Sequence, residues 1–119
     1  MRKPSTPKKV ATQPKTSARS RPLRGVLPVF QTPWLADETL DLATLEREIA
    51  WLYDSGADGI VLAMVSEVLR LSSDEREKLA EAACRFGRSR GVVIISVGAE
   101  SNKLAERYAK HAEVSGADA

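Results

Sequence analysis

Few side chains in this 119-residue sequence could act as nucleophiles. A lysine forms an imine with a carbonyl compound only as the neutral amine, and an exposed lysine keeps a pKa of about 10. Lys78, Lys103 and Lys110 fall on segments of helical periodicity, on faces that we predict to be exposed, and the other lysines lie within residues 1–24. We therefore expect none of these lysines to form an imine.

The single histidine and the single cysteine suggest structural roles. His111 lies close to Tyr108 on a predicted helix, and we expect it to be a partly buried structural residue. Cys84 follows Ala83 on the apolar face of another predicted helix, which favours a small core residue. No spacing of His, Cys and carboxylate residues suggests a metal site, and we predict neither a metal nor a cofactor.

Three apolar runs alternate with three segments of helical periodicity. The runs 25–34, 59–65 and 92–98 predict strands, and the last two lack polar alternation, as is typical of strands buried on both faces. The element order β-α-β-α-β-α predicts an α/β fold with parallel strands and right-handed crossovers.

The helical segments carry clear start and stop signals. The first spans about 42–54 and follows Asp41, a typical N-cap residue. The second begins after Ser72, which forms a capping-box pattern with Glu75, and the third ends at Gly116. The tryptophans are expected to pack between helices and sheet: Trp34 and Trp51.

Two classes of parallel α/β fold remain. A doubly wound sheet typically has a glycine-rich turn after its first strand, and the stretch "FQTPW" contains no glycine. A (β/α)₈ TIM barrel needs no such turn, but it takes about 250 residues. The motif "SGAD" precedes the second predicted strand at 55–58 and recurs at 115–118, where a further strand would begin. We predict the three N-terminal β/α units of an incomplete TIM barrel over residues 25–119.

Residues 1–24 differ from the rest in composition. They contain eight Lys or Arg, no acidic residue and four prolines, so we predict a disordered basic leader. Subtracting these eight charges from the net charge of +2 leaves −6 for residues 25–119. Nucleic-acid binding is not expected, because no aromatic side chain lies among the basic ones. The sequence has no membrane-spanning apolar run, and we expect a cytoplasmic location.

Several short motifs in this order resemble one enzyme family. They are "TP" followed by an aromatic residue at 32–34, "GADGI" at 56–60, the spacing of Glu67 to Glu75 and Arg76, and "HAEVSGADA" at the end. Residues 25–119 resemble the N-terminal part of the dihydrodipicolinate synthase / N-acetylneuraminate lyase family. The resemblance implies a homo-oligomeric class I aldolase that holds a 2-keto acid such as pyruvate as a Schiff base. In that family the lysine and the main tyrosine lie on later strands, so the chain is expected to be truncated before them and inactive alone.

The resemblance also implies the substrate-binding residues. The family loop after the second strand reads Gly-Thr-Thr-Gly-Glu, and the corresponding stretch is "AMVSE" at 63–67. We predict that Val65, Ser66 and Glu67 bind substrate and that the Ser66 hydroxyl occupies the proton-relay position. A packed loop in which Ser66 caps a backbone group is the structural alternative. In the loop after the third strand we predict substrate contacts from Gly98 and Ser101, with a helix N-cap as the alternative for Ser101.

A second class of function stays open. Three strands leave unpaired edges and an uncovered apolar face, which favour association. The alternative prediction is a non-catalytic α/β fragment that associates with copies of itself or binds a longer family member.

Overall fold

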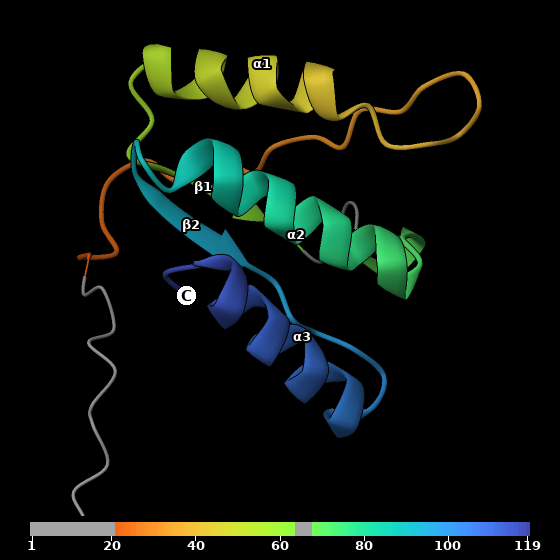
Figure 1. Cartoon of the computed structure of the whole chain (residues 1–119). Coiled ribbons are helices and arrows are strands. Elements are labelled where there is room, and N and C mark those ends of the chain that lie inside the picture. The colour runs from red at the N-terminus through yellow and green to blue at the C-terminus, as the bar shows by residue number, and fades with distance from the viewer. Residues whose placement is uncertain (1–20, 64–67) are drawn as a thin grey trace, which may run out of the picture.

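The computed structural model describes residues 21–63 and 68–119 (Figure 1). The elements in chain order are α1 (Leu42–Asp54), β1 (Gly59–Leu62), the 3₁₀ helix η1 (Val68–Arg70), α2 (Ser73–Gly87), β2 (Val92–Ile95) and α3 (Asn102–Ser115). The predicted disordered leader falls largely outside the described residues, so it stays a prediction.

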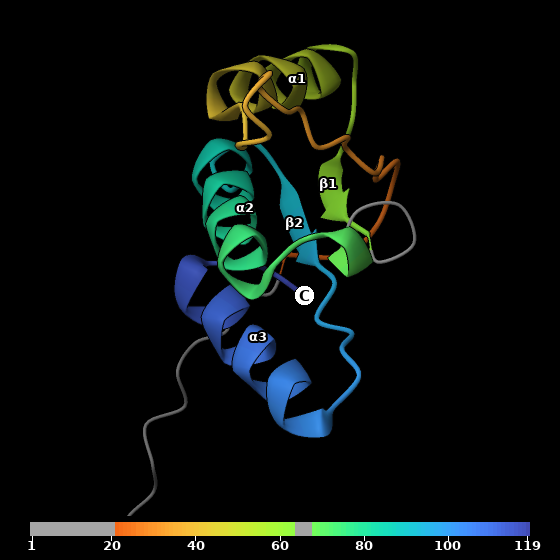
Figure 2. The ribbon, with the colours of Figure 1, turned by 90° about the vertical axis from the view of Figure 1, so that its right-hand side faces the viewer.

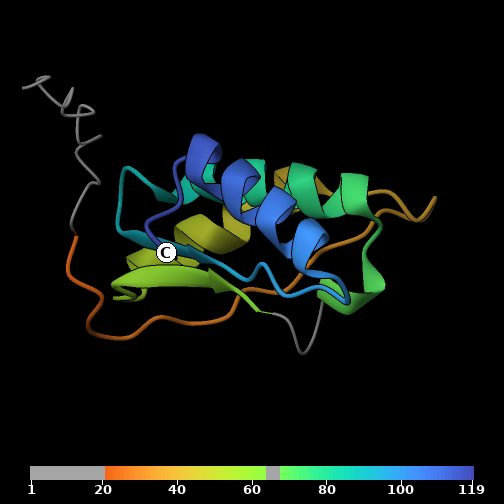
Figure 3. The same cartoon turned by 90° about the horizontal axis from the view of Figure 1, so that it is seen from below.

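The two strands form a parallel sheet whose helices lie on one side. β1 and β2 pair in register from Gly59 with Val92 to Leu62 with Ile95. α2 lies between α1 and α3 in Figure 2, and Figure 3 shows the helices above the sheet. Strand, crossover helix and parallel neighbouring strand form the repeating unit of an α/β barrel. The predicted α/β architecture is therefore confirmed for the described residues, although both strands are shorter than predicted.

The strand predicted over 25–34 is wrong as a continuous element. The segment runs beside β1 and forms one isolated parallel bridge, between Val29 and Val61. The Val61 N–H donates to the Pro28 carbonyl at 3.0 Å, and the Phe30 N–H donates to the Val61 carbonyl at 3.3 Å. Pro28 has no N–H, so it cannot supply the next bond of the ladder. The chain direction was correct, but the proline limits the pairing.

The core lies between the sheet and the helices. Side chains alternate along a strand, and the strand residues that face the helices are buried: Ile60, Leu62, Val93 and Ile95. They belong to one apolar cluster with Leu45 and Ile49 of α1 and Leu79 of α2. Cys84 is buried in the same cluster, which confirms its prediction as a core residue. The face of the sheet that meets the helices is therefore shielded from water.

The predicted helix caps are confirmed. The Asp41 carboxylate accepts a hydrogen bond from the Thr44 N–H at 3.0 Å, at the start of α1. Ser72 and Glu75 form the reciprocal capping box at the start of α2. Such caps satisfy N–H groups that the first helical turn leaves without partners.

The two copies of "SGAD" build the same connection. Gly56 and Gly116 both adopt left-handed backbone, with φ of 102° and 100°. The Asp58 carboxylate accepts a hydrogen bond from the Val26 N–H at 2.8 Å, and the Asp58 N–H donates to the Val26 carbonyl at 2.9 Å. In the same way, the Asp118 carboxylate accepts from the Val93 N–H at 2.9 Å, and the Asp118 N–H donates to the Val93 carbonyl at 2.8 Å. Each copy thus turns a helix end and attaches the following residues to the preceding extended segment.

The prediction for the tryptophans is wrong. Trp51 is 63% exposed and Trp34 is 43% exposed. The buried face of α1 is formed by Leu45, Ile49 and Tyr53, spaced four residues apart. Trp51 lies two positions after Ile49, which places it on the opposite face of the helix.

Candidate functional site

The candidate site lies at the carboxyl ends of β1 and β2. Because the strands are parallel neighbours, Ala63 and the loop 96–101 emerge at the same edge of the sheet. Three of the predicted site residues, Val65, Ser66 and Glu67, fall outside the described residues. The two described ones, Gly98 and Ser101, lie in the loop that connects β2 to α3.

Ser101 forms the N-cap of α3. Its backbone is extended, and its hydroxyl accepts a hydrogen bond from the Leu104 N–H at 3.2 Å. This is the capping role given above as the alternative for Ser101. A contact between Ser101 and substrate stays a prediction.

Gly98 is connected to α2 by a buried arginine. The Arg76 guanidinium donates to the Gly98 carbonyl at 2.8 Å through Nη1 and to the Ser96 carbonyl at 3.2 Å through Nη2. Arg76 is only 7% exposed. A planar guanidinium can donate to two acceptors at once from one rigid fork, which suits it to holding two carbonyls of the same loop.

Aromatic and hydroxyl groups surround this arginine. Its guanidinium carbon lies 3.8 Å from the centre of the Tyr108 ring, a cation–π arrangement. The Tyr108 hydroxyl in turn forms a 2.8 Å hydrogen bond with the Ser73 hydroxyl. Burial lowers the pKa of Arg76, and Tyr108 acts in the opposite sense. An arginine remains protonated at neutral pH, so the loop lies against a permanent positive charge.

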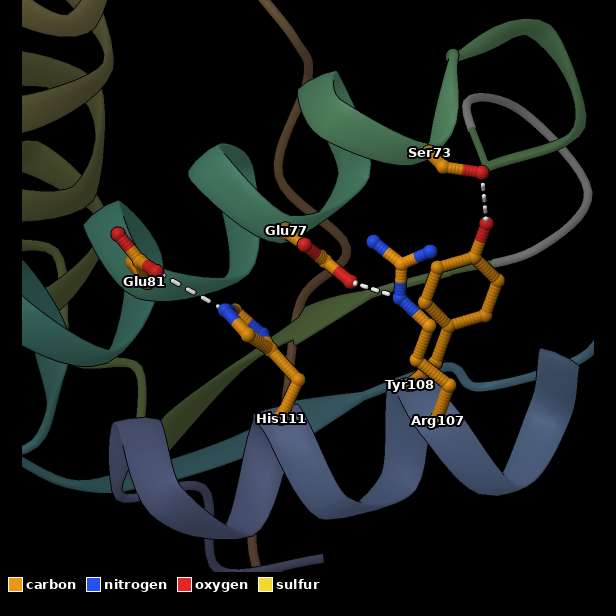
Figure 4. A network of polar contacts seen from close by, with 6 residues as sticks. All are labelled: Ser73, Glu77, Glu81, Arg107, Tyr108 and His111. Atoms are coloured by element: carbon orange, nitrogen blue, oxygen red, sulfur yellow. Dashed lines mark hydrogen bonds and ion pairs between the residues drawn. The ribbon is translucent and has the colours of Figure 1, made fainter.

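Three polar contacts join α2 to α3 (Figure 4). Besides the contact between Ser73 and Tyr108, Arg107 pairs with Glu77 at 2.7 Å and His111 with Glu81 at 2.9 Å. The α2 partners are spaced four residues apart and therefore lie on one face of the helix. These contacts fix α3, and with it the end of the loop 96–101, against α2.

The described residues provide a binding edge but no candidate amine nucleophile. Lys78, Lys103 and Lys110 are all exposed on helices, as predicted. Burial raises the pKa of the Cys84 thiol to about 11, so this thiol is neutral at physiological pH. The arrangement can therefore bind and orient a ligand through its loop, whereas imine formation requires an amine from elsewhere.

The part of the chain that the structure describes contains neither a metal-binding cluster nor a membrane-spanning helix. Among residues 21–63 and 68–119, no group of three His, Cys, Asp or Glu side chains is placed to hold a metal ion. In the same residues no helix is long and apolar enough to cross a bilayer.

Sequence reasoning missed Arg76 as a component of the site. A signal was present, because Arg76 lies three and seven residues before Leu79 and Ala83, on the apolar face of α2. A charged residue in an apolar helical stripe requires polar partners at the buried position. The sequence could therefore have indicated a buried arginine, although not which carbonyls it contacts.

This chain is similar to a described protein family and to several known proteins. The sequence model of the dihydrodipicolinate synthetase family matches residues 22–119. A 4-hydroxy-tetrahydrodipicolinate synthase from Acidiphilium cryptum is 37% identical over 95 residues, which cover 79% of this chain and 32% of that protein. An L-2-keto-3-deoxyarabonate dehydratase from Azospirillum brasilense is 30% identical over 103 residues, which cover 86% of this chain and 33% of that protein.

A solved structure agrees with these sequence matches. It is YagE, a prophage protein of the dihydrodipicolinic acid synthase family from E. coli K12, in complex with pyruvate. The TM-score is 0.76 at 28% identity, over 80% of this chain and 32% of that one. The chain spans about a third of the length of the curated relatives that it matches.

Proposed function

Because this chain belongs to the dihydrodipicolinate synthetase family and has the fold of part of its TIM barrel, we propose that it contributes to a binding site for a 2-keto acid such as pyruvate. The observation that carries the proposal is the position of the loop 96–101 beside the end of β1. Barrel enzymes bind their substrates at this carboxyl edge of the strands. The pyruvate complex of the related prophage protein supports the choice of ligand.

The proposed chemistry is that of a Schiff-base aldolase or lyase. In such a reaction a neutral lysine amine attacks the keto carbon and water leaves, which gives an iminium. In cleavage the iminium accepts the electron pair of the neighbouring carbon–carbon bond, whereas in synthesis it loses a proton and the resulting enamine supplies the pair for the new bond. The lysines on the described helices are exposed to solvent and not enclosed in an apolar pocket. The proposal therefore assigns the reactive amine to a polypeptide segment outside residues 1–119, and assigns ligand binding alone to this chain. It includes a homo-oligomeric assembly and a cytoplasmic location.

Two measurements on the 119-residue chain test this division. In saturation-transfer NMR, the pyruvate methyl group should receive saturation from the chain, and an excess of a different 2-keto acid, 2-oxobutyrate, should reduce this signal. After borohydride treatment with pyruvate, the intact mass should show no adduct on lysine. Absence of saturation transfer would reject the binding site, whereas a reduced lysine adduct would show that the chain supplies its own nucleophile.

The uncovered sheet face supports a second candidate function, association without catalysis. Val29 pairs with Val61, and Val61 is in register with Ile94, so the three side chains form one row across the sheet. We call Val29, Val61 and Ile94 the open row. Val29 is 43% exposed and the other two are half-buried. Apolar rows of this kind favour contact with another protein surface.

Light scattering during size-exclusion chromatography tests this alternative. Self-association through the open row predicts a dimer or larger species that Val61→Lys converts to monomer. Ser89→Lys, a substitution on the helical side, should leave the assembly unchanged. A wild-type monomer over a wide concentration range would count against self-association.

A further inference from the structure

Arg76 connects the covered side of the sheet to the candidate site. We propose that Arg76 is a positioning residue, which turns the peptide between Gly98 and Ala99 so that the Ala99 N–H is presented to the carboxylate of the 2-keto acid. This inference rests on the proposed function, and it adds a role for a residue that contacts no substrate itself.

The direction of the N–H follows from peptide geometry. The Arg76 Nη1 group lies 2.8 Å from the Gly98 carbonyl oxygen, which therefore points toward α2 and the covered side. No cis peptide bond occurs in the described residues. In a trans peptide the carbonyl and the following N–H point in opposite directions. The Ala99 N–H therefore points away from the helical layer, toward the open side of the sheet.

The second carbonyl contact makes this orientation rigid. Nη2 of the same guanidinium lies 3.2 Å from the Ser96 carbonyl, so one planar group is held at two points of the loop. The Tyr108 ring lies 3.8 Å from the guanidinium carbon, and the ring is itself held by Ser73. A donor that is already oriented before ligand binding stabilises an anion without a reorganisation cost.

The Ala99 N–H is available for a ligand in the described part of the molecule. Within residues 21–63 and 68–119 it donates to no backbone carbonyl. Gly98 has no side chain and Ala99 has only a methyl group, so neither residue of this peptide carries a bulky side chain. A backbone N–H to a carboxylate is a charge-assisted hydrogen bond, stronger than a bond between neutral groups.

Pyruvate titration of the ¹⁵N-labelled chain tests the proposal. In the wild type we expect the Ala99 amide to shift saturably. In Arg76→Met the apparent Kd should rise about tenfold and the Ala99 shift should be lost, because the freed peptide can rotate. Arg76→Lys keeps the charge but cannot hold two carbonyls in one plane, so we expect only partial recovery.

Arg90→Met is the matched control. It removes an arginine that also donates to a carbonyl, that of Ala50 at 3.2 Å, and lies over an aromatic ring, but it contacts no carbonyl of the loop 96–101. It should therefore bind pyruvate as the wild type does.

The outcomes separate this inference from the proposed function. If no amide of the wild type responds to pyruvate, the proposed function fails and this inference fails with it. If other amides of the wild type respond but Ala99 does not, only the role of the Ala99 N–H is overturned. The wild-type titration alone gives this result. If Ala99 responds equally in Arg76→Met, or if Arg76→Lys restores binding completely, positioning by the guanidinium is overturned.

Discussion

The two faces of the β1–β2 sheet carry similar residues in different surroundings. On the covered face, Val93 is fully buried beneath the helices. On the open face Val61, a residue of the same type on the neighbouring strand, is only half-buried. Since the strands are shared, the difference arises from the helical layer and not from the strand sequences.

This comparison shows where the stability of the chain resides. Burial of apolar surface contributes about 25 cal/mol per Å², so most of the hydrophobic stabilisation comes from the covered face. The open row adds little stability in the described residues, but it retains the apolar character of a barrel interior. The candidate site lies at the end of this face, where Ala63 has only a methyl group and Gly98 has no side chain.

The largest expected effect on stability is the loss caused by truncating a valine on the covered face, compared with the same truncation on the open face. Val93→Ala removes two methyl groups from a packed site and should lower the free energy of unfolding by about 2 kcal/mol or more. Val61→Ala removes the same atoms from a half-buried site and should cost less than about 1 kcal/mol. Urea unfolding at low protein concentration measures both. Equal costs would mean that another surface covers the open row in solution.

The pH dependence of stability reports on the dryness of the covered face. Burial raises the pKa of the Cys84 thiol from 9.0 to about 11, Asp118 adds to this effect and Arg88 opposes it. The unfolded thiol loses its proton above pH 9, whereas the folded one keeps it until about pH 11. The contribution of the neutral thiol to the free energy of unfolding is therefore fully present below pH 9. This contribution is lost as the pH rises from 9 through 11.

Cys84→Ala isolates this effect. Between pH 9 and 11 the wild type should lose on the order of 2 kcal/mol of unfolding free energy relative to Cys84→Ala. Chemical unfolding at a series of pH values gives the difference between the two proteins. Parallel curves across this range would contradict a dry environment around the thiol.

Local signals in the sequence were sufficient for the helices but not for the loops. The span of α1, the capping box at Ser72 and the helix end at Gly116 could be predicted, since each depends on residues within a few positions. The extent of strand pairing at 25–34 could not be predicted. It depends on whether the neighbouring strand offers an acceptor at Pro28, which has no N–H to donate.

The candidate site was predicted only in part for the same reason. Gly98 and Ser101 were placed in the correct loop, and the cap at Ser101 follows from local spacing. The contact between Arg76 and Gly98 joins residues 22 positions apart through a side chain, and no local pattern specifies it. The roles of Val65, Ser66 and Glu67 stay predictions.

The smallest expected effect distinguishes the two "SGAD" turns, whose carboxylates make the same bond in different surroundings. Asp118 accepts from the N–H of Val93, which is fully buried, and Asp58 accepts from the N–H of Val26, which is 67% exposed. Asp118→Ala leaves a buried donor without a partner and should cost about 1–2 kcal/mol. Asp58→Ala exposes its donor to water, which replaces the lost acceptor, so its cost should stay below about 1 kcal/mol. Urea unfolding of both variants, with Asn replacements as controls that keep an acceptor oxygen, measures the difference. A larger loss for Asp58→Ala would mean that the edge beside residues 25–30, and not the covered face, limits the stability of the sheet.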